Sequence, residues 1–401
     1  MTPCIDSRRR QVLIGSVSAV TAAGLSRFSS PGIAAPAEQA KPLPGYADWK
    51  DADSVIVHSA NTIETKRGEL GTSVMTPGEK LFVRNNLNPP SAEIVANPDA
   101  WTISVEGVKS PRSVKVGDLK NMGVGTVAVA LQCSGNGRGF FDHKASGTQW
   151  KMGAAGCVIW SGIPVAVLAE NLGGPVDGVR FMTGTGGETV PQGLDPKDVI
   201  VERSVPLAAM KNALLAWEMN GEPVPLAHGG PLRLIVPGYY GVNNVKYIKR
   251  LAFTPKETDA KIHSSGYRVR PVGEKGAPTQ PSMWEMNVKS WIDQPAGTIK
   301  VPAGTVQITG VAFAGTKSVS QVEVSTDGGK TWHAADFIGP DLGPYAWRTF
   351  VFPAKLAAGS YVLASRATGA DGDTQPADRL ENERGYANNS WRDHAVKVNV
   401  V

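Results

Sequence analysis

The sequence predicts a mostly β protein of the α+β class, and three observations carry this prediction. Glycine (45) and proline (29) are frequent in the 401 residues, which favours short strands and turns over long helices. Apolar and polar residues alternate in short runs, as in residues 101–116. From about residue 285 such runs recur at the spacing of an immunoglobulin-like β-sandwich. We expect a leader at 1–37, a first domain at 38–280 and a sandwich domain at 281–401.

Composition and cysteine content narrow the class of protein. Hydrophobic residues make up 41% and charged residues 19%, which is typical of a globular protein. The formal net charge is only +5, and no dense Lys/Arg stripe is interleaved with aromatics, which argues against a nucleic-acid partner. Cys4, Cys133 and Cys157 are too few for a disulfide scaffold, and none lies in a zinc-binding or haem-attachment motif. We therefore expect no covalently attached haem in this chain.

The first 37 residues have the features of an export signal. Residues 8–10 are three consecutive arginines, and the apolar run at 12–25 that follows them is too short to span a bilayer. Small residues suit cleavage after Ala35 or Ala37, which would remove Cys4. An amphipathic helix is the alternative, but no charged residue lies in the apolar run to form its polar face. The pattern predicts twin-arginine export to a bacterial periplasm, without membrane insertion.

Four segments outside the candidate site have simple predictions. Residues 41–66 are punctuated by Pro and Gly and are expected to run over the surface. Residues 101–116 predict a pair of strands, and 163–172 predict a short helix. Asp327-Gly328 is a hairpin signal between two alternating runs of the sandwich domain.

Cys133 stands where a predicted buried strand meets a glycine-lined loop. The apolar run at 124–131 ends at Gln132, and residues 134–137 read Ser-Gly-Asn-Gly. Most lone cysteines are small buried hydrophobes. Here, glycines allow a ligand to approach the backbone, and Arg138 lowers the cost of a thiolate, which suits a soft metal. No second Cys or His stands at a metal-ligand spacing, so a metal would arrive already bound to another group.

Residues 131–138 resemble the molybdenum-binding segment of the sulfite oxidase family. In that family a single cysteine ligates a molybdenum that is already held by a pterin dithiolene. The resemblance implies that Cys133 is the metal ligand and that the cofactor is molybdenum with molybdopterin. It extends from about Lys66 to the C-terminus and implies a sulfite-oxidase-type molybdopterin domain followed by an immunoglobulin-like dimerisation domain.

Residues 81–90 resemble a second segment of this family, in which an arginine faces the substrate and a residue two positions later contacts the pterin. The resemblance assigns these roles to Arg84 and Asn86, with Phe82 and Val83 beside the cofactor. Animal enzymes usually have His where this chain has Asn86, so that contact must differ. A surface salt bridge is the ordinary alternative for Arg84.

The run from residue 214 to 247 resembles the family over more than thirty residues. It implies that His228, Arg233 and Lys246 hold the pterin and its phosphate, with Asn244 and Val245 beside them. A loop histidine without a role is the alternative for His228, and the recurring spacing argues against it.

Shorter resemblances add Trp150, expected to line the pocket, and Thr185, expected near the pterin phosphate. Cys157, among small apolar residues, is expected to fill the core. The glycine loop after residue 183 lacks the spacing of a nucleotide-binding motif.

Three arginines and a tyrosine complete the implied active site. The resemblance gives Tyr267 a place facing the metal, and residues 382–385 favour Arg384 over Arg392 as the arginine that returns to the site from the second domain. Arg84, Arg138 and Arg384 would then form a cationic pocket for a dianion, with Tyr267 donating a hydrogen bond.

The resemblance implies a periplasmic sulfite dehydrogenase that works by oxygen-atom transfer. Its expected partners are sulfite, a separate c-type cytochrome and a second copy of the chain. Two alternatives stay open: a sulfoxide or nitrate reductase of the same fold, and a cofactor-free binding protein built from two β domains.

Overall fold

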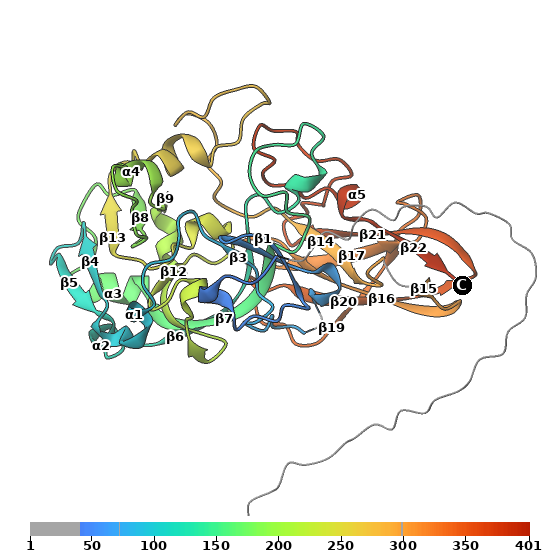
Figure 1. The fold of residues 1–401 in the computed structure, drawn as a ribbon, viewed down its shortest axis with the longest axis horizontal. Coiled ribbons are helices and arrows are strands. Elements are labelled where there is room, and N and C mark those ends of the chain that lie inside the picture. The colour runs from blue at the N-terminus through green and yellow to red at the C-terminus, as the bar shows by residue number, and fades with distance from the viewer. Residues whose placement is uncertain (1–40, 72, 298–299) are drawn as a thin grey trace, which may run out of the picture. The chain divides into compact units, whose positions relative to one another are not determined.

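The computed structural model describes residues 41–401 except residue 72 and residues 298–299 (Figure 1). The predicted export signal, with its three arginines, its cleavage positions and Cys4, lies outside the described residues. Within them the predicted mostly β fold is confirmed, because five sheets carry the structure and the helices are short. The helical segments of the first half include α1 (Glu93–Ala96), α2 (Val116–Leu119), η4 (Arg138–Phe140), α3 (Val165–Asn171) and α4 (Pro196–Val199). Those that follow are η6 (Leu226–His228), η7 (Gly241–Asn243), η8 (Ile262–Gly266) and α5 (Trp391–His394).

A small antiparallel sheet occupies the segment expected to run over the surface. Its strands are β1 (Val55–Ser59), β2 (Thr62–Thr65) and β3 (Val83–Arg84). Every residue of β2 is buried, so that expectation was wrong for β2, while most residues of 41–61 are exposed or partly exposed. The Glu64 Oε1 atom accepts bonds of 2.9 Å from the main-chain nitrogens of Lys151 and Gly153, which fixes β2 against the chain just after the cysteine loop.

The second sheet has the order β11-β10-β7-β6, with β12 paired to β10. Its strands are β6 (Gly125–Gln132), β7 (Ala155–Pro164), β10 (Leu214–Met219), β11 (Glu222–Pro223) and β12 (Arg233–Ile235). β6 matches the strand predicted at 124–131 within one residue at each end and is buried over its last five residues. Its antiparallel register with β7 pairs Gln132 with Ala155 at the point where the cysteine loop begins.

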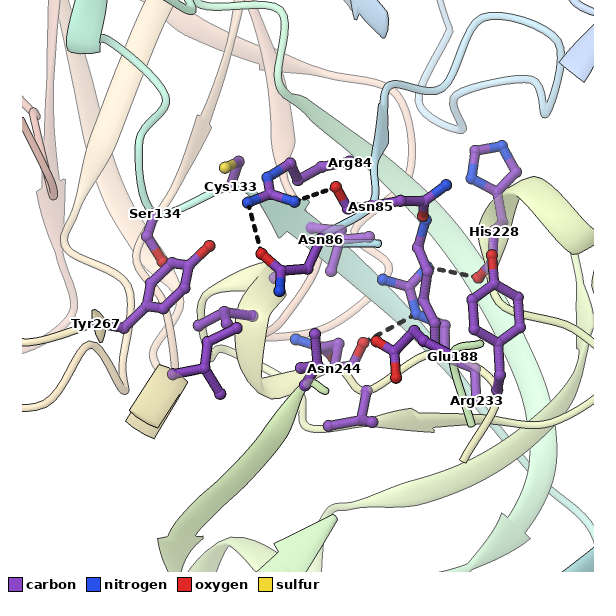
Figure 2. Close-up of a pocket in the computed structure, with 18 of the residues that line it drawn as sticks. Arg84, Asn85, Asn86, Cys133, Ser134, Glu188, His228, Arg233, Asn244 and Tyr267 are labelled. Carbon is purple, nitrogen blue, oxygen red and sulfur yellow. Dashed lines mark hydrogen bonds between the residues drawn. The ribbon is translucent and has the colours of Figure 1, made fainter. Parts of the chain in front are cut away.

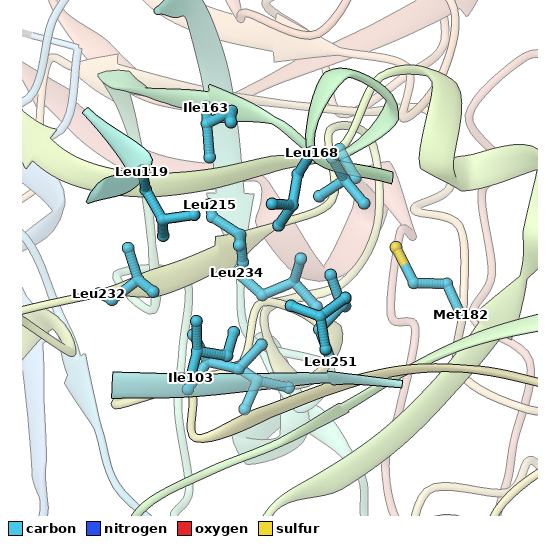
Figure 3. Close-up of a cluster of buried hydrophobic side chains, with 14 of the residues drawn as sticks. Ile103, Leu119, Ile163, Leu168, Met182, Leu215, Leu232, Leu234 and Leu251 are labelled. Atoms are coloured by element: carbon cyan, nitrogen blue, oxygen red, sulfur yellow. The ribbon is translucent and has the colours of Figure 1, made fainter. Parts of the chain in front are cut away.

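The third sheet has the order β5-β4-β13-β8-β9. Its strands are β4 (Thr102–Glu106), β5 (Arg112–Lys115), β8 (Phe181–Thr185), β9 (Glu202–Pro206) and β13 (Arg250–Thr254). β4 and β5 are antiparallel, which confirms the predicted strand pair, and α3 confirms the predicted short helix. Fully buried aliphatic side chains of this sheet, of α3 and of the second sheet form one core, which includes Ile103, Leu168, Leu215, Leu234 and Leu251 (Figure 3).

The C-terminal part is a sandwich of two sheets, as predicted. One sheet has the order β14-β16-β20-β19, with strands β14 (Lys289–Gln294), β16 (Gly304–Phe313), β19 (Asp336–Ile338) and β20 (Arg348–Leu356). The other has the order β15-β22-β21-β17-β18, with strands β15 (Lys300–Val301), β17 (Val319–Ser325), β18 (His333–Ala334), β21 (Gly359–Gly369) and β22 (Val396–Val400). Buried side chains from both sheets, including Ile308, Phe350, Val324 and Leu363, share one core.

Asp327 lies in the connection between β17 and β18, which are antiparallel. Its carboxylate accepts main-chain bonds from Lys330 and Thr331, each of 3.0 Å. The Asp-Gly hairpin signal is confirmed, although the connection is longer than a two-residue turn.

Candidate active site

The cysteine loop is held in shape by its own backbone and by one asparagine. Cys133 follows β6 directly, and its main-chain nitrogen donates to the Ala154 oxygen at 2.9 Å. The Asn136 side chain donates to Gln132 Oε1 at 3.1 Å and accepts from the Ala154 nitrogen at 3.1 Å. Gly137 has a φ of 99°, a conformation that side chains strongly disfavour, which explains the glycine at this position.

A turn from the C-terminal part braces this loop. The Ala387 main-chain nitrogen donates to the Ser134 oxygen at 2.9 Å, and Asn388 Nδ2 donates to the Gly137 oxygen at 3.0 Å. Lys289, at the start of β14, is buried and donates to the main-chain oxygens of Asn388 at 2.7 Å and Asn136 at 3.3 Å. The segment that carries Arg384 is thereby fixed relative to Cys133.

A pocket opens beside the cysteine loop (Figure 2). Ten of the predicted site residues line it: Phe82, Arg84, Asn86, Cys133, His228, Arg233, Asn244, Val245, Lys246 and Tyr267. The figure shows Cys133, Ser134 and Tyr267 at one end, and Glu188, Arg233 and His228 at the other. Residues that are more than a hundred positions apart in the sequence are therefore brought together around one cavity.

Arg84 connects the cysteine end of the pocket to Asn86. Its guanidinium donates to Asn86 Oδ1 at 3.4 Å and to the main-chain oxygen of Asn85. Burial acts to lower the pKa of Arg84, but the nearby Tyr267 and Cys133 outweigh it and raise that pKa above its ordinary value. Arg84 therefore keeps its positive charge at this end of the pocket.

At the other end of the pocket, Lys246 is a buried amine surrounded mainly by other basic groups. It donates to Asn85 Oδ1 at 2.6 Å. Burial lowers the pKa of Lys246 well below its ordinary value, and the positive charges of Arg233 and Arg84 lower it further. A bound anion would reverse this effect, because an opposite charge favours the protonated amine.

His228 and Arg233 stand beside Lys246 on a rigid support. Arg233 donates to the His228 main-chain oxygen at 2.9 Å and lies over the Trp160 ring at 5.2 Å. The Lys50 amine lies 3.1 Å from His228 Nε2. Burial holds the pKa of His228 well below its ordinary value, and the Lys50 charge adds to this, so the ring is neutral at neutral pH.

Two buried polar atoms that line the pocket point to an absent polar ligand. Among the described residues, Ser134 Oγ and Glu188 Oε2 are buried without a hydrogen-bond partner. Such atoms are rare in folded proteins, because an unpaired buried polar group is costly. Burial raises the pKa of Glu188 to about 7. One of these two unpaired atoms lies at each end of the pocket, which fits an elongated ligand with polar groups at both ends.

A second, more open cavity adjoins the first and shares Arg84, Asn86, Ile262 and Tyr267 with it. Arg384 and Tyr386 line this second cavity. Arg392 does not, because its side chain is 60% exposed and pairs with Asp378. Of the two arginines weighed from the sequence, the structure places only Arg384 beside Arg84.

Four predicted residues line neither cavity. Val83 and Trp150 are fully buried behind the pocket wall. The Thr185 hydroxyl donates to Glu202 Oε2 at 2.6 Å. Arg138 is buried and donates to main-chain oxygens. Direct contact of these four residues with cofactor or substrate stays a prediction.

Sequence reasoning missed Asn85, Ser134, Glu188 and Tyr386, which line the cavities. Ser134 follows the cysteine directly, and Asn85 lies between two predicted site residues, so adjacency could have suggested both. Glu188 follows the glycine loop after residue 183 and Tyr386 follows residues 382–385, but neither belongs to a motif that assigns it a role.

The residues present suit a cofactor that is anionic at one end and binds a soft metal at the other. Within the described part of the chain, no cluster of three or more His, Cys, Asp or Glu side chains could hold a metal ion. Cys133 is the soft donor of the pocket, while Lys246 and Arg233 suit a phosphate.

No described helix is long and apolar enough to cross a membrane.

Two family models match most of the chain. Residues 90–262 match the family "Oxidoreductase molybdopterin binding domain", and residues 280–401 match "Mo-co oxidoreductase dimerisation domain". Mitochondrial sulfite oxidase of Homo sapiens is 31% identical over 382 residues, covering 87% of this chain and 67% of the human protein. A nitrate reductase [NAD(P)H] of Hordeum vulgare is also 31% identical, covering 81% of this chain and 39% of the barley protein.

A solved structure shows the same fold. The sulfane dehydrogenase SoxCD of Paracoccus pantotrophus superposes with a TM-score of 0.70 at 24% identity, covering 86% of this chain and 88% of that chain. The fold is that of a molybdopterin oxidoreductase. The chain belongs to the sulfite oxidase family.

Proposed function

We propose that this protein oxidises sulfite to sulfate at a molybdenum–molybdopterin centre and passes the electrons to a separate c-type cytochrome. The observation that carries the proposal is the position of Arg84, which lies beside Cys133 and lines both cavities. A cation at that position places an oxyanion next to the metal ligand. The similarity to mitochondrial sulfite oxidase supports sulfite as that anion.

The chain's own residues would hold the cofactor along the first pocket. The Cys133 thiolate is the protein ligand for molybdenum, and Lys246 and Arg233 bind the terminal phosphate. Neutral His228 offers a hydrogen bond at the same end. Glu188 Oε2 is free to accept an N–H bond from the pterin ring. When bound, the centre supplies oxygen-atom transfer and the uptake of two electrons.

The substrate would enter through the second cavity. Arg84 and Arg384 bind and orient the dianion, and the Tyr267 hydroxyl donates a hydrogen bond to one of its oxygens. Sulfite and water yield sulfate, two protons and two electrons, and two one-electron cytochromes accept the electrons. Because sulfite and sulfate carry the same charge, the arginines bind both, and only sulfite has the lone pair that reacts.

We propose further that the protein works in the periplasm after twin-arginine export and that it is a two-fold homodimer. The family match to a dimerisation domain over residues 280–401 supports the dimer. Light scattering at micromolar concentration would report twice the chain mass, and a single chain mass would contradict the dimer.

Nitrate reduction is the second candidate, because the barley nitrate reductase and human sulfite oxidase are each 31% identical to this chain. One experiment separates the two. Purified protein is assayed for sulfite-dependent reduction of cytochrome c and for nitrate-dependent oxidation of reduced methyl viologen. We expect the first activity and little of the second. Nitrate turnover without sulfite turnover would overturn the proposal.

A further inference from the structure

Tyr386 forms the wall of the second cavity next to Tyr267. The two rings are stacked, with centroids 5.2 Å apart and planes 6° from parallel. Tyr386 is buried, at 2% exposed, although it lines the cavity. Its ring is therefore packed against Tyr267 rather than free to turn into solvent.

Guanidinium groups lie close to both rings of this stack. Arg203 lies over Tyr267 at 5.7 Å from the ring centroid, while Arg138 and Arg384 lie over Tyr386 at 5.4 and 5.9 Å. Cations are attracted to the faces of aromatic rings, and parallel rings attract each other when offset. Each tyrosine therefore contacts the other ring and at least one arginine.

The backbone of Tyr386 is fixed relative to the metal ligand. Its main-chain nitrogen donates to Asn382 Oδ1 at 2.8 Å, and its main-chain oxygen accepts from Asn382 Nδ2 at 2.9 Å. The next residue, Ala387, donates to the main-chain oxygen of Ser134, which follows Cys133. Gly385 has a φ of 57°, and a side chain there would collide with Arg138.

We propose that Tyr386 is a positioning residue for substrate binding, which holds the Tyr267 hydroxyl and the Arg384 guanidinium toward the anion beside Arg84. The inference rests on the proposed function, and it adds a residue from the C-terminal half to the substrate site. The ring does the positioning. The Tyr386 hydroxyl makes only a long contact of 3.4 Å to the Gly266 oxygen.

The test compares Tyr386→Leu with the conservative variant Tyr386→Phe. Tyr386→Leu removes the stack, so we expect the sulfite KM to rise about tenfold while kcat changes by about twofold or less. The Kd for sulfate, measured by titration calorimetry without turnover, should rise in parallel. Tyr386→Phe keeps the ring and should restore wild-type values. If the leucine variant does not fold, Tyr386→Met replaces it, because the longer and more flexible methionine side chain adapts better to the space left by the ring.

A matched control separates positioning from general destabilisation. Phe313 in β16 is also 2% exposed and belongs to the same buried cluster, but it lines neither cavity. Phe313→Leu should lower the melting temperature and leave KM and the sulfate Kd unchanged. Wild-type sulfate affinity in Tyr386→Leu, or the same loss in Phe313→Leu, would overturn the inference. Absence of sulfite turnover in the wild type would instead overturn the proposed function, and the sulfate titration would still report on Tyr386.

Discussion

Arg138 Nε donates a hydrogen bond of 2.8 Å to the main-chain oxygen of Arg384, 246 residues further along the chain. The same guanidinium donates to the Thr148 oxygen at 3.0 Å. Arg138 therefore joins the cysteine loop to the turn that carries a second arginine into the substrate cavity. Its guanidinium binds main-chain oxygens of these two segments, whereas the sequence suggested that it contacts the substrate.

Replacement of Arg138 distinguishes these two roles. Arg138→Met leaves two partly buried carbonyl oxygens without their charged donor, and each such bond contributes about 1.5–3 kcal/mol. We expect a clear loss of stability together with a higher sulfite KM, because the Arg384 turn loosens. Thermal unfolding and steady-state kinetics measure both. A variant with unchanged melting temperature and a raised KM would favour direct contact with substrate.

Arg84→Gln tests the anion site directly. Loss of one charged partner of a desolvated anion costs about 2–5 kcal/mol, and 1.4 kcal/mol corresponds to tenfold. The sulfite KM should rise about thirtyfold or more. Arg392→Gln is the control, since that exposed side chain pairs with Asp378 and lines neither cavity, so the change should alter KM by less than about twofold. Equal effects in the two variants would contradict the proposed site.

Glu188 predicts a pH dependence in protein prepared without the cofactor. Burial raises the pKa of Glu188 from 4.5 to about 7 in the folded chain. The folded state therefore binds the Glu188 proton more tightly than the unfolded state does. The contribution of this proton to the free energy of unfolding is fully present below pH 4.5 and is lost as the pH rises through about 7. Glu188→Gln cannot ionise. Its stability relative to the wild type should improve between pH 5 and pH 8, by up to about 3 kcal/mol. Melting curves with a constant difference across this range would rule out the raised pKa.

The predicted export signal can be tested without the folded structure. Replacing the arginines at positions 8, 9 and 10 with lysine should leave unprocessed protein in the cytoplasm, because the twin-arginine pathway recognises consecutive arginines. Cell fractionation followed by immunoblotting measures this. Periplasmic protein at the wild-type level would show that another route is used.

The sequence predicts those features of the site that depend on neighbouring residues. The strand that ends at Gln132 and the loop after Cys133 follow from local periodicity and turn residues, whereas the run that ends near Lys246 was assigned from its resemblance to the family. The contact of Lys246 with Asn85, 161 residues earlier, depends on how the sheets pack. The stack of Tyr267 on Tyr386 and the orphan carboxylate of Glu188 depend on packing in the same way. The burial of β2 was missed because its anchor, Glu64, bonds to backbone some ninety residues away.

In the proposed function, Cys133 holds a molybdenum centre that oxidises sulfite. The most direct measurement is the rate of sulfite-dependent ferricyanide reduction by purified wild-type protein and by Cys133→Ser, with molybdenum content determined on the same samples. We expect about one molybdenum per chain and sulfite-dependent turnover in the wild type, and a folded Cys133→Ser variant without turnover. Wild-type protein that contains no molybdenum, or near-normal turnover in Cys133→Ser, would contradict the account.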